Sequence, residues 1–180
     1  MRFQKCLIDG VVEVFTEPHR DERGFFSRLY CPQAFADAGI SFNSTQINLS
    51  GNRRAHTLRG MHFQNPPFAE AKLVRCLTGS AYDVVLDIRP GSNSFGRWQG
   101  FTLSAQEMNA LFIPEGCAHG FLTLEDNTTL QYQMGRAYEP GHAKGICWDD
   151  AFFAIDWPHQ PVVISDADRT WPAYTKEHKY

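Results

Sequence analysis

The chain has 180 residues, of which 43% are hydrophobic and 21% are charged, and its formal net charge is -3. This length fits one compact domain, so we expect a single domain over residues 1–180. The hydrophobic content excludes a disordered chain, and the slightly acidic balance argues against nucleic acid as a partner.

Short runs of β-branched and aromatic residues, separated by turn residues, recur along the chain and predict a mostly β fold. The expected strands are, in chain order, Val11–Phe15, Phe25–Tyr30, Thr45–Leu49, His56–Gln64, Leu73–Thr78, Ala81–Arg89, Gly100–Leu103, Ala110–Ile113, Gly120–Leu124 and Thr128–Met134. One short helix is expected over Gln33–Ala38, because Pro32 suits a helix start and Gly39 suits a left-handed C-cap. The region after Pro140 lacks long strands and is predicted to pack across the barrel as a tail.

Apolar runs of only about five residues are far too short to span a bilayer, so we expect no contact with a membrane. The N-terminus reaches Asp9 before an apolar run of signal-peptide length can form, which favours a cytoplasmic protein. The five cysteines are odd in number and contain no C-x-x-C, so neither a disulfide framework nor a cysteine zinc site is expected.

Alternation along the strands predicts which side chains share a face. Within His56–Gln64, it assigns one face to Leu58, Gly60, His62 and Gln64, and the other face to Thr57, Arg59, Met61 and Phe63. Within Thr128–Met134, it groups Leu130, Tyr132 and Met134. His62 and Tyr132 therefore lie among apolar neighbours, and each should find a partner or a ligand, because an unpaired buried polar group costs about 1–3 kcal/mol.

The segment Pro114–Gly120 has the P-x-G-x-x-H spacing of the second cupin motif. Metal-binding cupins carry an H-x-H pair in their first motif, but the matching residues here read His62-Phe63-Gln64, so one ligand is missing. A metal would have to recruit His56, six residues back on the same predicted face, together with His62 and His119. We expect no metal, and a metal-dependent cupin oxygenase or isomerase remains an alternative.

Seven segments, in the same order, resemble the dTDP-4-dehydrorhamnose 3,5-epimerase family. They are Asp21–Phe26, Gln46–Asn48, Leu58–Gln64, Lys72–Cys76, Asp83–Arg89, Ile113–Phe121 and Gly145–Asp150. The resemblance implies a cupin-type jelly-roll barrel with a few short helices. It also implies an isomerase without a cofactor, which inverts C5 and C3 of a nucleotide-linked 4-keto-6-deoxyhexose in deoxysugar biosynthesis.

The chemistry of such a sugar explains which catalytic groups are needed. The C4 ketone acidifies the hydrogens at C3 and C5, because the carbanion delocalises as an enolate with its charge on O4. By resemblance, His62 is the base, and Asp168 binds its Nδ1 to fix the tautomer. Tyr132 is the acid on the opposite face of the sugar, and Lys72 stabilises the charge on O4.

The resemblance further implies substrate-binding positions around this centre. They are Arg23 and Arg59 for the diphosphate, Gln46 and Asn48 for the base or sugar, Tyr138 for stacking on the nucleobase, and His119 for the sugar, with Asp83 as its candidate partner. Each residue also has a structural interpretation: His62 as a core histidine bonded to a carbonyl, for example, or Lys72 as a surface lysine.

Four positions depart from the family pattern: Arg28, Ile47, Ala143 and Ala167. They place thymidine as the base in doubt, since a charge reversal near a nucleotide changes preference. The alternatives are an epimerase restricted to C3 or to C5 that acts on another nucleotide sugar, and a binding protein without turnover. The resemblance also implies a twofold homodimer formed by exchange of N-terminal strands, which would bring Arg23 to the site of the other chain.

Overall fold

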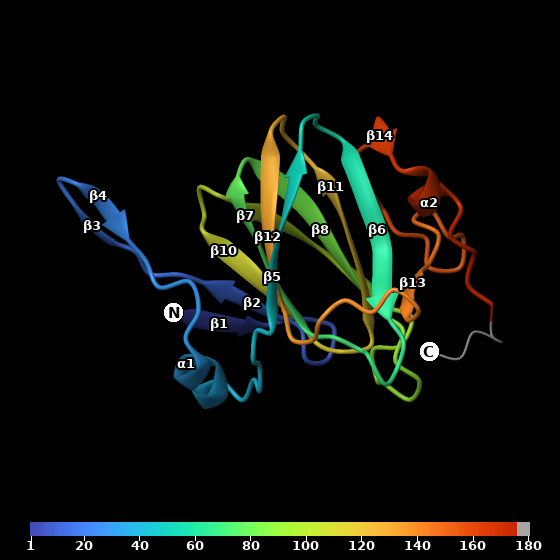
Figure 1. The fold of residues 1–180 in the computed structure, drawn as a ribbon, viewed down its shortest axis with the longest axis horizontal. Coiled ribbons are helices and arrows are strands. Elements are labelled where there is room, and N and C mark those ends of the chain that lie inside the picture. Colours follow the sequence, from blue (N-terminus) through green and yellow to red (C-terminus); the bar gives the residue numbers. More distant parts are fainter. Residues whose placement is uncertain (176–180) are drawn as a thin grey trace.

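The computed structural model describes residues 1–175, and strands account for most of its regular structure (Figure 1). The strands are β1 (Arg2–Lys5), β2 (Val12–Phe15), β3 (His19–Asp21), β4 (Gly24–Phe26), β5 (Gln46–Asn52), β6 (Thr57–Gln64), β7 (Lys72–Thr78), β8 (Ser80–Asp87), β9 (Trp98–Ser104), β10 (Asn109–Ile113), β11 (Cys117–Thr123), β12 (Thr128–Met134), β13 (Ala143–Gly145) and β14 (Val163–Ile164). The helices are α1 (Pro32–Asp37) and α2 (Asp166–Arg169). Within residues 1–175, no helix is long and apolar enough to cross a membrane.

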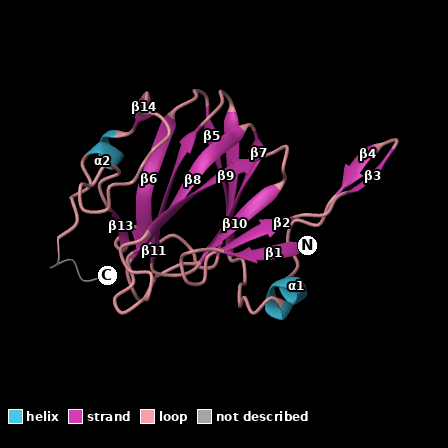
Figure 2. Cartoon of the chain, turned by 180° about the vertical axis from the view of Figure 1, so that it is seen from behind, coloured by secondary structure: helices cyan, strands magenta, loops and turns pink. Residues whose placement is uncertain are grey.

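Two sheets face each other and enclose the main core (Figures 1 and 2). One sheet has the strand order β1-β2-β10-β7-β12-β5, and the other has the order β13-β6-β11-β8-β9, with β14 added parallel to β6. Between them, Val74 and Leu111 of the first sheet pack against Val85 and Phe121 of the second. This arrangement confirms the predicted all-β jelly-roll architecture.

The segment after β13 covers the outer face of the second sheet, as predicted for a tail. Ile146, Phe153 and Ile155 from this segment form a buried cluster with Met61 of β6 and Leu86 of β8. Figure 1 shows the tail, in orange and red, running beside β6. The packing brings α2, near the end of the described chain, next to β6.

Near the N-terminus, the predicted helix is confirmed, whereas part of a predicted strand is wrong. Helix α1 lies within a residue of its expected bounds, and Gly39 adopts the predicted left-handed conformation with a φ of 78°. The expected strand over Phe25–Tyr30 is wrong beyond Phe26, because β4 pairs only with β3. These two strands form a separate hairpin that projects away from both sheets and offers no third strand to continue the pairing (Figure 1).

The regular alternation along β6 breaks at Gly60. The pairing of β6 with β11 shifts register between His119 and Phe121, and Gly60 has a φ of 128°. A Cβ on Gly60 would lie 2.5 Å from the Cα of Gly120, so the two strands approach more closely than any side chain allows.

The prediction that Leu58 and His62 share a face is therefore wrong. Leu58 and Met61 both pack against the tail side of the sheet, in clusters with Ile164 and Ile146 respectively. Arg59 and His62, which alternation assigned to opposite faces, both line a pocket between the sheets. The register shift moves every residue after Gly60 to the face opposite to the one that simple alternation predicts.

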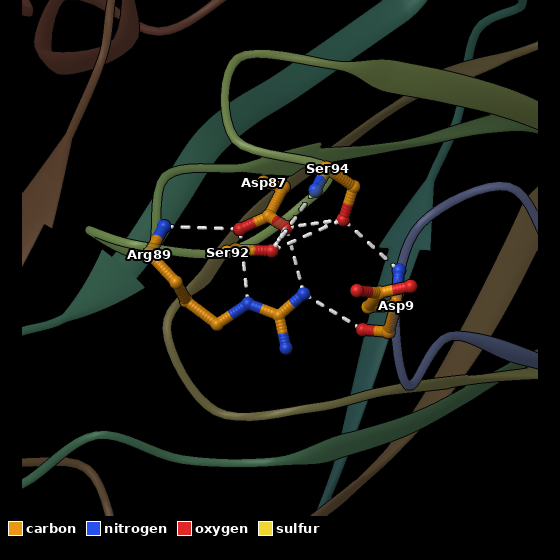
Figure 3. A network of polar contacts seen from close by, with 5 residues as sticks. All are labelled: Asp9, Asp87, Arg89, Ser92 and Ser94. Carbon is orange, nitrogen blue, oxygen red and sulfur yellow. Dashed lines mark hydrogen bonds and ion pairs between the residues drawn. The ribbon is translucent and has the colours of Figure 1, made fainter.

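A buried polar network ties the β8–β9 loop to the β1–β2 turn (Figure 3). The carboxylate of Asp87 accepts hydrogen bonds from Arg89 Nε (2.9 Å) and from the hydroxyls of Ser92 and Ser94 (both 2.6 Å). Arg89 also donates to the backbone carbonyl of Asp9 (2.7 Å). Burial alone would raise the pKa of Asp87, but the hydrogen bonds from Arg89, Ser92 and Ser94 outweigh burial and lower it to about 2.

We predict that Asp87→Asn lowers the free energy of unfolding by about 3 kcal/mol at pH 7, because it leaves buried donors without an ionised acceptor. The pKa of Asp87 lies below its usual value of 3.8, so the ionised form favours folding. This stabilisation is complete above about pH 4 and is lost as the pH falls toward 2. Urea unfolding across this range measures it. Asp9→Asn is the control, since Asp9 joins the network through its backbone carbonyl and its backbone N–H. Equal stability of the two variants at pH 7 would contradict the prediction.

Candidate active site

The pocket opens between the two sheets and has a volume of about 390 Å³. His62 of β6 and His119 of β11 line it from one sheet, and Lys72 of β7 and Tyr132 of β12 line it from the other. Strands distant in the sequence thus bring four of the predicted site residues together.

His62 is hydrogen-bonded to Asp168 of α2, with 2.6 Å between His62 Nε2 and Asp168 Oδ1. The expected contact was to Nδ1, and that detail is wrong, because the side-chain orientation on β6 turns Nε2 toward the tail. Nδ1 is therefore the ring nitrogen left to exchange a proton. The His62 side chain is 45% exposed, so a substrate in the pocket can reach it.

The tail holds the Asp168 carboxylate in place. Ser165 caps α2 by accepting a hydrogen bond from the Asp168 backbone N–H (3.1 Å). Burial acts most strongly and would raise the pKa of Asp168, but the hydrogen bond and charge of His62, together with hydrogen bonds from Trp171 and Ser165, outweigh it and lower the pKa. Asp168 therefore faces His62 as a carboxylate near neutral pH.

Tyr132 packs against the second histidine of the pocket. Its ring meets His119 edge-on, with the centroids 5.7 Å apart. His119 Nε2 in turn lies 2.8 Å from Asp83 Oδ2, which bears out the suggested pairing of these two residues. Burial, and after it the negative charge of Asp83, raises the pKa of Tyr132 well above its usual value of 10. The phenol therefore keeps its proton across the working pH range.

Lys72 is buried and forms an ion pair with Glu70. Its side chain is only 6% exposed, so the interpretation as a surface lysine is wrong. Both residues line the pocket that Tyr132 also lines, and the lysine offers it a cation. A buried lysine needs such a counter-charge, because an unpaired one would be strongly destabilising.

The predicted nucleotide-side residues form a polar group around the pocket mouth. Arg59 and Tyr138 line the pocket, and Arg59 Nε donates to Asn52 Oδ1 (2.9 Å). Asn48 also lines it, and its Oδ1 accepts from Gln46 Nε2 (2.9 Å), while the side-chain Oε1 of Gln46 accepts from the Tyr138 backbone N–H. The Tyr138 residue is 60% exposed, so its ring is open to a flat partner.

Arg23 does not join this group within one chain. It lies at the turn of the β3–β4 hairpin, its side chain is 90% exposed, and its ion pair is with Asp21 of the same hairpin. Figure 1 shows that hairpin extending away from the sheets.

Of the three histidines weighed as a metal set, His62 and His119 are ladder partners that line the pocket, whereas His56 lies apart from them. The ring of His56 stacks on His159 (4.2 Å between centroids), and His56 precedes β6 with a φ of 57° rather than continuing the strand. The expectation that His56 shares a strand face with His62 is wrong, because β6 starts only at Thr57. Across residues 1–175, His, Cys, Asp and Glu form no group of three arranged to hold a metal ion.

The four positions that depart from the family pattern are scattered. Only Ala143 lines the pocket; Arg28 borders a separate cavity near the N-terminus, Ile47 is exposed on β5, and Ala167 is exposed on α2. Most of these departures therefore lie outside the pocket of their own chain.

Sequence reasoning missed several residues that line the pocket, among them the polar or aromatic residues Glu70, Lys144 and Trp171. Glu70 could have been found, because it lies two residues before Lys72 and alternation puts them on one face. Trp171 follows Asp168 by three residues, the spacing of one helical turn. Lys144 had no comparable signal, since β13 is too short to give a period.

The comparisons with known proteins agree with this geometry. The family model described as dTDP-4-dehydrorhamnose 3,5-epimerase matches residues 5–176. The dTDP-4-dehydrorhamnose 3,5-epimerase of Escherichia coli is 46% identical over 165 residues, which cover 91% of this chain and 89% of that protein.

Two solved structures of this kind superpose closely on the chain. The enzyme from Bacillus anthracis, with TDP and PPi bound, gives a TM-score of 0.93 at 34% identity, covering 96% of this chain and 99% of that one. The enzyme from Legionella pneumophila, in complex with dTDP-4-keto-L-rhamnose, gives a TM-score of 0.90 at 33% identity, covering 96% and 92%. The chain belongs to the dTDP-4-dehydrorhamnose 3,5-epimerase family, a family of isomerases that act on carbohydrates.

Proposed function

We propose that this protein inverts C5 and C3 of a dTDP-linked 4-keto-6-deoxyhexose in deoxysugar biosynthesis. The observation that carries the proposal is the pairing of His62 and Tyr132, which enter one pocket from opposite sheets. Inversion at carbon requires a proton to leave one face and another to arrive on the opposite face. A base and an acid on facing walls meet that requirement without turning the sugar over.

His62 acts as the base. Its Nε2 is occupied by Asp168, so Nδ1 takes the proton from C3 or C5. The carboxylate stabilises the imidazolium that forms, and general-base assistance of this kind contributes about 10² to 10⁴ in rate.

Tyr132 and Lys72 carry out the rest of one inversion, after which His62 must release its proton to solvent and Tyr132 must take one up before the next. The proton that leaves C5 or C3 moves to His62, and the electron pair passes into an enolate whose oxygen, O4, faces the Lys72 ammonium. The Tyr132 hydroxyl then donates its proton to the carbon from the other face, and its raised pKa keeps that proton available until the carbanion forms. A cation beside O4 stabilises the negatively charged enolate oxygen more than the neutral ketone oxygen, which lowers the barrier to proton removal.

The nucleotide is bound at the pocket mouth. Arg59 supplies a guanidinium fork for the diphosphate, and the exposed Tyr138 ring stacks on the thymine. Thymidine is supported by the relatives solved with TDP and with a dTDP sugar. We propose that the reaction needs neither a metal nor a cofactor, since the ketone itself acidifies the carbons.

We further propose a twofold homodimer in which exchanged N-terminal strands bring Arg23 to the pocket of the other chain. The projecting hairpin supports this, because Phe25 (59%) and Phe26 (77%) are largely exposed on it in the single chain. Exposed aromatic residues on a projecting hairpin are typical of a contact surface.

With the dTDP-4-keto-6-deoxy sugar in deuterated water, the wild-type protein is expected to exchange hydrogen at C3 and C5, as followed by proton NMR. His62→Ala is expected to lower that exchange by about 10² to 10⁴, because the base is lost. His56→Ala is the control, since His56 lies outside the pocket and stacks on His159. No exchange at either carbon by the wild type would overturn the proposal. Loss of exchange in His56→Ala, with activity removed by a chelator, would favour the metal-dependent alternative.

Tyr132→Phe is expected to keep hydrogen exchange while slowing inversion by about 10², because only the opposite-face donor is lost. Product configuration by NMR and exchange by mass spectrometry separate the two steps. Tyr82→Phe is the matched control, since Tyr82 packs on Trp157 away from the pocket. Inversion at the wild-type rate in Tyr132→Phe would show that another group is the acid.

Light scattering at micromolar concentration is expected to give a dimer.

Arg23→Ala is expected to raise KM while leaving the dimer intact. Mixing Arg23→Ala with His62→Ala chains should restore activity at about a quarter of the sites, because random exchange makes half the dimers mixed and gives each mixed dimer one complete site. Arg20→Ala, on the same hairpin, is the control for loss of charge. A monomer, or no recovery on mixing, would contradict the shared site.

A further inference from the structure

Trp171 contacts the same carboxylate oxygen that holds His62. Its indole Nε1 donates to Asp168 Oδ1 (3.2 Å), and His62 Nε2 lies 2.6 Å from that oxygen. Two side chains therefore compete for the charge on one oxygen atom. Any change in one of these contacts alters how strongly the oxygen attracts the other side chain.

The indole ring is held in this position by its fit against β13. A Cβ on Gly145 would fall 2.4 Å from the Trp171 ring, so a glycine is needed there to leave room for the indole. Gly145 is also the ladder partner of His62 on β6. The ring meets His62 edge-on, with the centroids 6.4 Å apart, and lines the pocket.

Other charged or titratable groups lie at the same pocket, on both sheets. They are Arg59 of β6, the Lys72–Glu70 pair at β7, the His119–Asp83 pair of β11 and β8, Tyr132 of β12 and Lys144 of β13. None of them has a hydrogen bond to Asp168 among those found in the described chain, whereas Trp171 does. Among the described residues, Trp171 is therefore the tail side chain whose hydrogen bond reaches the Asp168 carboxylate.

We propose that Trp171 is a positioning residue, which orients the Asp168 carboxylate and withdraws part of its charge so that His62 stays neutral and able to accept a proton. The inference rests on the proposed role of His62 as base. Without the indole N–H, the carboxylate holds the imidazolium more tightly. More of the His62 population is then protonated at a given pH, and fewer molecules can start the reaction.

Trp171→Phe tests this, because it keeps an aromatic wall and removes only the N–H donor. The acidic limb of the pH profile of kcat/KM is expected to move to higher pH by about half a unit, an approximately threefold loss on the acidic side. The NMR titration of the His62 ring protons, identified by their absence in His62→Asn, is expected to shift the same way. Gly145→Ala, which displaces the indole without removing it, should move the titration in the same direction.

Trp157→Phe is the matched control. Trp157 belongs to the same tail, and its indole N–H donates to the Trp148 carbonyl (2.9 Å), so Trp157→Phe also removes an indole hydrogen bond. Trp157 does not line the pocket. An unmoved titration in Trp171→Phe, or equal movement in both phenylalanine variants, would overturn the proposal. If the wild type neither exchanges nor inverts the sugar while the His62 titration still moves in Trp171→Phe, the proposed function fails and the link between Trp171 and His62 stands.

Discussion

The contact between Asp168 and His62 is the interaction on which the site depends. It joins the tail, at α2, to the middle of β6, and it fixes which ring nitrogen faces the pocket. The pair has a small desolvation cost, because the histidine stays half exposed and the buried carboxylate is hydrogen-bonded. A tail packed elsewhere would leave the histidine with neither orientation nor counter-charge.

The two-sheet architecture supplies the second requirement, groups on facing walls. β6 and β12 belong to different sheets, so His62 and Tyr132 lie on different walls of the pocket. The register shift at Gly60 matters here, since it lets Arg59 and His62 point into the same pocket although they are three residues apart. Regular alternation would have sent one of them to the outer face.

Much of the fold follows from local patterns in the chain. Strand positions could be predicted because β-branched and aromatic runs are bounded by turn residues, and α1 because Pro32 and Gly39 mark its ends. Short edge strands such as β13 and β14 gave no period to detect. The strand expected to continue past Phe26 does not form, because its residues have β propensity but no neighbouring strand pairs with them.

The sequence by itself determined the residue types of the site, the family and the chemistry that a histidine, a tyrosine and a lysine can perform on a keto sugar. Only the tertiary structure decided that Nε2 rather than Nδ1 meets Asp168, that Lys72 is buried beside Glu70, and that Trp171 shares the carboxylate. The reason is physical: side-chain identity is local, whereas rotamers, burial and shared hydrogen bonds depend on which distant segments pack together.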